Sequence, residues 1–163
     1  MHRDVLDWVG RWVAPGRVLE FGSRDINGTV RDLFPNADEY LGVDPQEGPG
    51  VDLVADAASC DAGLNRWDVV VCTEVLEHAE DAAGIIANAY RHLRADGRFI
   101  MTCAAPGRGP HSAIDENPIR DFEFYRNVDG AMLAGWLGAA GFQQWTIDLH
   151  GFDIRCVAYR WEV

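Results

Sequence analysis

Residues 18–28 read VLEFGSRDING, an apolar strand that passes one carboxylate, Glu20, and one glycine, Gly22, before polar turn residues. A dinucleotide fingerprint would need G-x-G-x-x-G at this place, but Arg24 stands at the second glycine position and the next glycine is Gly28. Asp25 and Glu20 would also repel a pyrophosphate. The stretch therefore predicts a ligand-binding loop at the end of a strand that does not hold a dinucleotide.

Strands and helices alternate along the rest of the chain. Apolar runs predict strands at 17–22, 39–44, 51–56, 67–74 and 98–105, and helical spacing predicts helices near the N-terminus and at 26–34, 80–95 and 129–140. The stretches 142–150 and 154–161 flank a short turn and predict an antiparallel hairpin. This order predicts an α/β fold with a doubly wound, mostly parallel sheet of seven strands.

Length, composition and charge restrict the number of domains, the location and the partners that the sequence predicts. The 163 residues suffice for one domain, and no apolar run approaches the roughly 20 residues of a membrane span, so we expect a cytoplasmic protein. The net charge of −12 argues against a nucleic-acid partner. The four cysteines are widely spaced, which favours reduced thiols over a disulfide or metal site. The sequence leaves the number of subunits open.

Acidic residues end the second and third predicted strands. Asp44 is placed to accept hydrogen bonds from both hydroxyls of a ribose, and Pro45 keeps its backbone extended. The simpler alternative is that Asp44 only starts a turn. An adenosine derivative with an ammonium and a sulfonium suits these charges, with Glu20 near the ammonium and Asp56 near the adenine amino group.

The motifs VLEFGSRDING, YLGVDPQ, LVADAA, WDVVVCTEVLEH, HLRADGRFIMT and AGWLGAAGF resemble, in order and spacing, class I S-adenosylmethionine-dependent methyltransferases. The resemblance is to the group with S/T-E-V-L-E-H after the fourth strand, and it implies a Rossmann-like fold. The resemblance covers roughly residues 17–163 and implies a substrate-side insert or lid at 105–128. Together with the chain length and the helical spacing of the first residues, it predicts a single methyltransferase domain over 1–163 with an N-terminal helix at 1–16. The cofactor would be S-adenosylmethionine, bound by Glu20, Gly22, Ser23, Asp44, Pro45, Asp56, Ala57, Thr73 and Glu74.

Two histidines are candidate general bases, needed only if the methyl acceptor must lose a proton. His78 follows the fourth strand and His111 lies in the insert; the alternatives are a packing role for His78 and a solvated loop position for His111. The run LEH at 76–78 lacks the second histidine of a zinc-binding helix, so no metal site is expected there.

Three functions remain open from the sequence. The first is methyl transfer to a small-molecule, sugar or lipid-linked acceptor. The second is methylation of a protein, since an acidic surface can dock a basic partner. The third is a module that binds S-adenosylmethionine without turnover, because the first loop departs from the family's E-x-G-x-G-x-G. Within the insert, a lid over the site could be formed by Phe122, Phe124, Tyr125 and Arg126. Alternatively, Phe122 and Phe124 only anchor the loop to the core.

Overall fold

The computed structural model describes residues 3–115 and 117–161. Residues 1–2 of the expected N-terminal helix, residue 116 of the expected insert and residues 162–163 of the expected domain lie outside the described residues. None of the described helices is long and apolar enough to cross a membrane.

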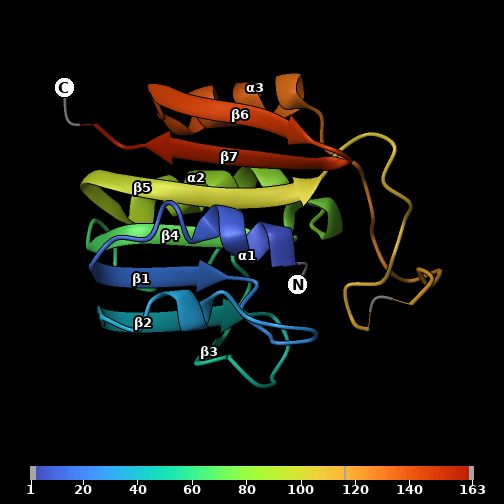
Figure 1. Cartoon of the computed structure of the whole chain (residues 1–163), viewed down its shortest axis with the longest axis horizontal. Helices are drawn as coiled ribbons and strands as arrows, with labels where there is room; N and C mark the ends of the chain where they lie inside the picture. The colour runs from blue at the N-terminus through green and yellow to red at the C-terminus, as the bar shows by residue number, and fades with distance from the viewer. Residues whose placement is uncertain (1–2, 116, 162–163) are drawn as a thin grey trace.

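Seven strands form one sheet in the order β3-β2-β1-β4-β5-β7-β6 (Figure 1). Strands β1 to β5 are parallel, and β7 and β6 are antiparallel to their neighbours. The predicted fold class and the C-terminal hairpin are confirmed. The strands are β1 (Gly16–Phe21), β2 (Ala37–Asp44), β3 (Leu53–Val54), β4 (Trp67–Thr73), β5 (Leu93–Ala104), β6 (Gln144–His150) and β7 (Asp153–Tyr159).

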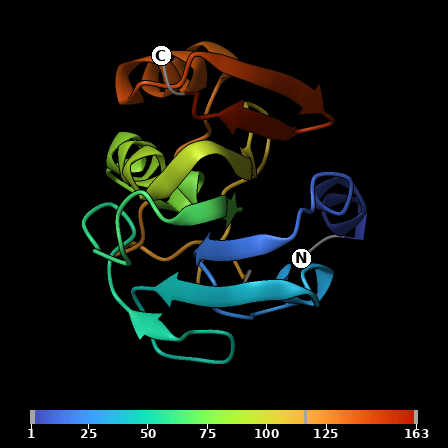
Figure 2. The ribbon, with the colours of Figure 1, turned by 90° about the vertical axis from the view of Figure 1, so that its left-hand side faces the viewer.

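Helices cover both faces of the sheet (Figure 2). Helices α2 (Ala82–His92) and α3 (Gly130–Ala140) pack on one face, and α1 (Arg3–Val9) packs on the other. Strand β4 lies between these two layers. Val70 packs in the core beneath α2 and α3, whereas Val69 and Val71 pack in the core beneath α1. This two-sided burial explains why β4 is apolar at almost every position.

Several elements are shorter than the sequence pattern predicts, two of them markedly. In place of the helix expected at 26–34 there is only a 3-10 turn, η1 (Arg31–Leu33). Gly28, whose N–H is accepted by Asp25 Oδ1 at 2.7 Å, has a φ of 122°, and this non-helical backbone makes the chain turn where a helix would begin. The strand expected at 51–56 is reduced to β3 at the sheet edge, and Asp52 there accepts the N–H of Gly42 instead.

The remaining helices follow the prediction more closely. Helix α2 begins after Asp81, whose side chain accepts the N–H of Gly84, and a 3-10 turn, η2 (Leu76–His78), precedes it. Helix α3 ends at Gly141, which has a φ of 109° and forms the predicted cap. The N-terminal helix ends at Val9, so Trp12 lies outside it. Trp12 still packs on the core beneath α1.

Candidate active site

A cavity of about 480 Å³ lies at the carboxyl ends of β1, β2 and β4. The strand order reverses direction between β1 and β4, and ligands of such sheets bind at that point. Every residue proposed from the sequence for cofactor binding or catalysis lines this cavity, while the role of each stays a prediction. They are Glu20, Gly22, Ser23, Asp44, Pro45, Asp56, Ala57, Thr73, Glu74, His78 and His111.

The first loop turns tightly at Gly22. Its φ is 78°, and a Cβ at this position would overlap Cγ2 of Val75, so only glycine fits. The carbonyl of Val43 on β2 accepts the N–H groups of both Gly22 and Ser23, at 2.8 and 3.1 Å. The loop is therefore fixed to the neighbouring strand despite the missing glycines.

Arg24 occupies the position where the resembling family usually has its second glycine. Its guanidinium donates to Oε1 of Gln46 and, at 3.0 Å, to the carbonyl of Ile114. The side chain thus connects the first loop to the segment after β2 and to residues 105–128. This arrangement explains how the loop accommodates an arginine in place of glycine.

Glu20 lies at the floor of the cavity and is 2% exposed. Tyr40 donates its hydroxyl to Glu20 Oε2 at 2.7 Å. Burial raises the pKa of the Glu20 carboxyl to about 7, and the hydrogen bond from Tyr40 opposes that shift. An ammonium group beside Glu20 would favour its ionised form.

Asp44, at the end of β2, and Asp56, after β3, each stabilise the turn that follows with side-chain hydrogen bonds. Asp44 Oδ1 accepts the N–H of Gln46 at 2.9 Å, and Oδ2 accepts the N–H of Arg24 at 3.3 Å. Asp56 Oδ1 accepts the N–H of Ala58 at 2.9 Å. The turn role considered for Asp44 is therefore real, and it leaves the carboxylate on the cavity lining, where it can still accept bonds from a ligand.

The loop after β4 carries a carboxylate in an unusual backbone conformation. Glu74 has a φ of 57°, and its Oε1 accepts the hydroxyl of Thr102 at 2.7 Å. Arg108 pairs with Asp153, and its Nη2 lies 3.6 Å from Glu74 Oε2. Burial raises the pKa of Glu74. The charge of Arg108 is thus shared between two carboxylates.

Two histidines and a tyrosine form an aromatic cluster at one side of the cavity. The ring centroids of His78 and His111 are 4.9 Å apart, and the ring of Tyr125 lies 5.3 Å from the first and 5.2 Å from the second. Burial, with the neighbouring His111, lowers the pKa of His78 to about 4. His78 is therefore neutral at neutral pH.

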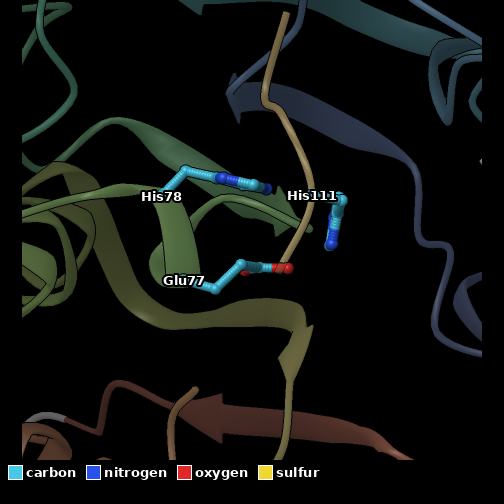
Figure 3. A group of neighbouring side chains, drawn as sticks. All are labelled: Glu77, His78 and His111. Carbon is cyan, nitrogen blue, oxygen red and sulfur yellow. The ribbon is translucent and has the colours of Figure 1, made fainter. Parts of the chain in front are cut away.

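Glu77 directly precedes this cluster and points toward it (Figure 3). Its side chain is fully buried, and Oε1 accepts the N–H of Ala104 at 3.2 Å. Burial and the nearby Glu74 raise the pKa of Glu77 well above its usual range. Glu77 belongs to the motif TEVLEH but was not among the site residues predicted from the sequence. Its position three residues after Glu74, in the turn that follows β4, was the available signal.

The family model described as a methyltransferase domain matches residues 1–147 of the chain. The chain belongs to this methyltransferase domain family. The predicted enzyme class is confirmed. No curated protein matches the sequence of this methyltransferase.

Solved structures share the fold at low sequence identity. YcgJ from Bacillus subtilis has a TM-score of 0.75 and 16% identity, over 99% of this methyltransferase and 100% of that chain. Burkholderia thailandensis 1,6-didemethyltoxoflavin-N1-methyltransferase has a TM-score of 0.72 and 18% identity, over 98% of this chain and 78% of that one. It holds 1,6-didemethyltoxoflavin and S-adenosylhomocysteine, which agrees with the predicted cofactor. The [4+2]-cyclase SpnF has a TM-score of 0.71 and 16% identity, over 97% and 81% of the two chains.

Proposed function

We propose that this methyltransferase transfers the methyl group of S-adenosylmethionine to a small molecule. One observation carries the proposal: three carboxylates, Glu20, Asp44 and Asp56, come from the ends of three consecutive strands and line one cavity. In this assignment Glu20 binds the ammonium of the cofactor and Asp44 binds its ribose. Asp56 binds the adenine amino group.

The acceptor side of the cavity supports a small molecule. Residues of the segment 105–128, among them Arg108 and His111, line the same 480 Å³ cavity as the cofactor residues. The structurally similar didemethyltoxoflavin methyltransferase also holds a small acceptor. We assign residues 105–128 to the acceptor side of a single domain and the chain to the group with TEVLEH after β4. A cytoplasmic location stays a prediction from composition.

Methyl transfer from a sulfonium is an in-line displacement, so the protein must align the acceptor atom, the methyl group and the sulfur and exclude water. A general base contributes only when the acceptor is protonated, as a hydroxyl is. The predicted bases, His78 and His111, both line the cavity. Replacing the one that acts as base by glutamine would lower turnover about a hundredfold or more.

Calorimetry tests the cofactor assignment. We expect S-adenosylmethionine and S-adenosylhomocysteine to bind to the protein, and NAD not to bind, because Glu20 and Asp25 stand where a pyrophosphate would lie. Binding of NAD without a response to S-adenosylmethionine would overturn the proposal. Asp44→Ala serves as the control for binding in the assigned cavity.

Turnover must be measured separately, because SpnF shows that this fold also occurs in a cyclase. The protein is incubated with S-adenosylmethionine and either pooled small molecules or pooled peptides, and S-adenosylhomocysteine is quantified by mass spectrometry. Product with the small-molecule pool supports the proposal. Product only with peptides favours a protein methyltransferase. Binding without product in either pool favours a module without turnover.

A further inference from the structure

Three side chains able to bind a metal ion converge beside the cavity. Glu77 and His78 extend from η2 toward the segment that carries His111 (Figure 3). One ligand atom from each lies within 4.8 Å of the other two. The two histidines come from distant parts of the sequence, so no local spacing pattern reveals the group.

An independent observation also indicates a missing ligand. Glu77 is fully buried, and its Oε2 has no hydrogen-bond partner among residues 3–115 and 117–161. The Nδ1 atom of His78 is likewise buried without a partner in that part of the chain. Buried polar atoms without partners are costly, which points to a bound group that satisfies them.

The surrounding charges favour a cation. Arg108 is the nearby cationic side chain, and Asp153 and Glu74 share its charge. Together with Glu77, these carboxylates outnumber the arginine.

We propose that Glu77, His78 and His111 bind one divalent transition-metal ion. Two imidazole nitrogens and one carboxylate oxygen are ligands typical of Zn²⁺ and related ions, and three protein ligands leave a position open for water or a further oxygen. The Nδ1 of His111 lies 3.2 Å from the carbonyl of Gly109, a contact that orients the ring if Nδ1 carries the proton. This proposal replaces the expectation that the site binds no metal.

The site has a consequence for the proposed methyl transfer, although metal binding itself does not depend on that function. His78 and His111 also line the cavity assigned to the acceptor. A hydroxyl bound to a divalent cation loses its proton more readily. With the ion bound, both imidazoles would hold it, so a hydroxyl acceptor on the ion would release its proton to solvent water and not to either histidine.

Titration of chelator-treated, tag-free protein with Co²⁺ tests the site without cofactor or acceptor. We expect one equivalent to bind and to produce visible absorption bands of a low-coordinate Co²⁺ site. Glu77→Gln and His111→Gln should each weaken binding about tenfold or more. His150→Gln is the matched control, because His150 is exposed on β6 and lies outside the cavity lining. It should bind Co²⁺ as the original protein does.

Affinity for S-adenosylhomocysteine, measured on each variant, shows whether the cavity has kept its structure. If Glu77→Gln does not fold, His111→Gln carries the test, because His111 lies outside the sheet and the helices. The proposal is overturned if the original protein produces no Co²⁺ bands, or if folded His111→Gln binds Co²⁺ as tightly as the original protein. If Co²⁺ does not bind but S-adenosylmethionine does, only the metal site is overturned. If S-adenosylmethionine does not bind in the calorimetry, the proposed function is overturned.

Discussion

The hydroxyl of Tyr40 donates a 2.7 Å hydrogen bond to Glu20 Oε2 at the floor of the cavity. The donor comes from β2 and the acceptor from β1, and these neighbouring parallel strands place them together. Burial raises the pKa of Glu20 to about 7 despite this bond, so the carboxyl titrates in the neutral range.

Cofactor affinity should therefore depend on pH through Glu20. If only the ionised carboxylate binds the ammonium, affinity for S-adenosylmethionine should rise roughly eightfold between pH 6 and pH 7.5. Calorimetry at both pH values measures the change. In Glu20→Gln the affinity should be lower and the rise absent; an equal rise in that variant would assign the titration to another group.

The free energy of unfolding without ligand should fall as pH rises, whereas the cofactor affinity should rise. A carboxyl whose folded pKa lies above its unfolded value of 4.5 binds a proton more tightly in the folded state. Glu20 thus contributes stability at low pH that is lost between about pH 4.5 and 7, at most about 3 kcal/mol. Denaturant unfolding of the original protein and of Glu20→Gln at pH 5 and 7.5 isolates this contribution, which the variant should lack.

Replacing Asp44 by alanine should weaken cofactor binding by about 1.5 to 3 kcal/mol, the range for hydrogen bonds to a charged group. The variant also loses the bonds to the N–H groups of Gln46 and Arg24, so part of the loss could arise from a looser turn. Asp44→Asn separates the two effects, because its amide oxygen can still accept the N–H of Gln46. Unchanged cofactor affinity in folded Asp44→Ala would leave Asp44 with the turn role alone.

Removing the Arg24 side chain should loosen residues 105–128. Arg24→Ala loses the bond to the carbonyl of Ile114, which connects this segment to the first loop. We expect faster cleavage within 105–128 in limited proteolysis, since exposed segments with fewer contacts open more often. Arg11→Ala, a change at an exposed arginine after α1, is the control and should be cleaved like the original protein. Equal cleavage of both variants would argue against this connection.

Two glycines should respond oppositely to alanine. Gly22→Ala should destabilise the protein by about 1 to 3 kcal/mol, because its φ is 78° and the Cβ would overlap Val75. Gly135→Ala should stabilise it by about 0.5 to 1 kcal/mol, because Gly135 lies inside α3 and a Cβ there meets no atom within 4 Å. Thermal unfolding measures both. Similar melting temperatures for the two variants would contradict the inference that the first loop has no room for a Cβ at Gly22.

The sheet could be predicted because its strands carry unambiguous patterns. Strand β4 is buried on both faces and reads as an apolar run, and the stretches that flank Gly151 alternate as hairpin strands do. The helix expected at 26–34 was wrong because Gly28 adopts a φ of 122°, which an α-helix cannot contain and which periodicity does not report.

Some residues of the candidate site could likewise be predicted from the sequence, and others could not. Residues at strand ends, such as Glu20 and Asp44, could be selected because parallel strands bring their carboxyl ends together. Arg108 could not, since it lies in a segment without helix or strand and reaches the cavity lining through the tertiary fold. Glu77 was missed because the direction of its side chain depends on the short turn η2.

The strand order separates the two halves of the proposed reaction along the chain. All the residues assigned to the cofactor precede Val75 and belong to β1 through β4 and the loops that follow these strands. Arg108, His111 and Tyr125 instead lie in one segment between β5 and α3, outside the sheet. In the proposed assignment, exchanging that segment would alter the choice of acceptor, while the cofactor residues and His78, which follows β4, stay unchanged.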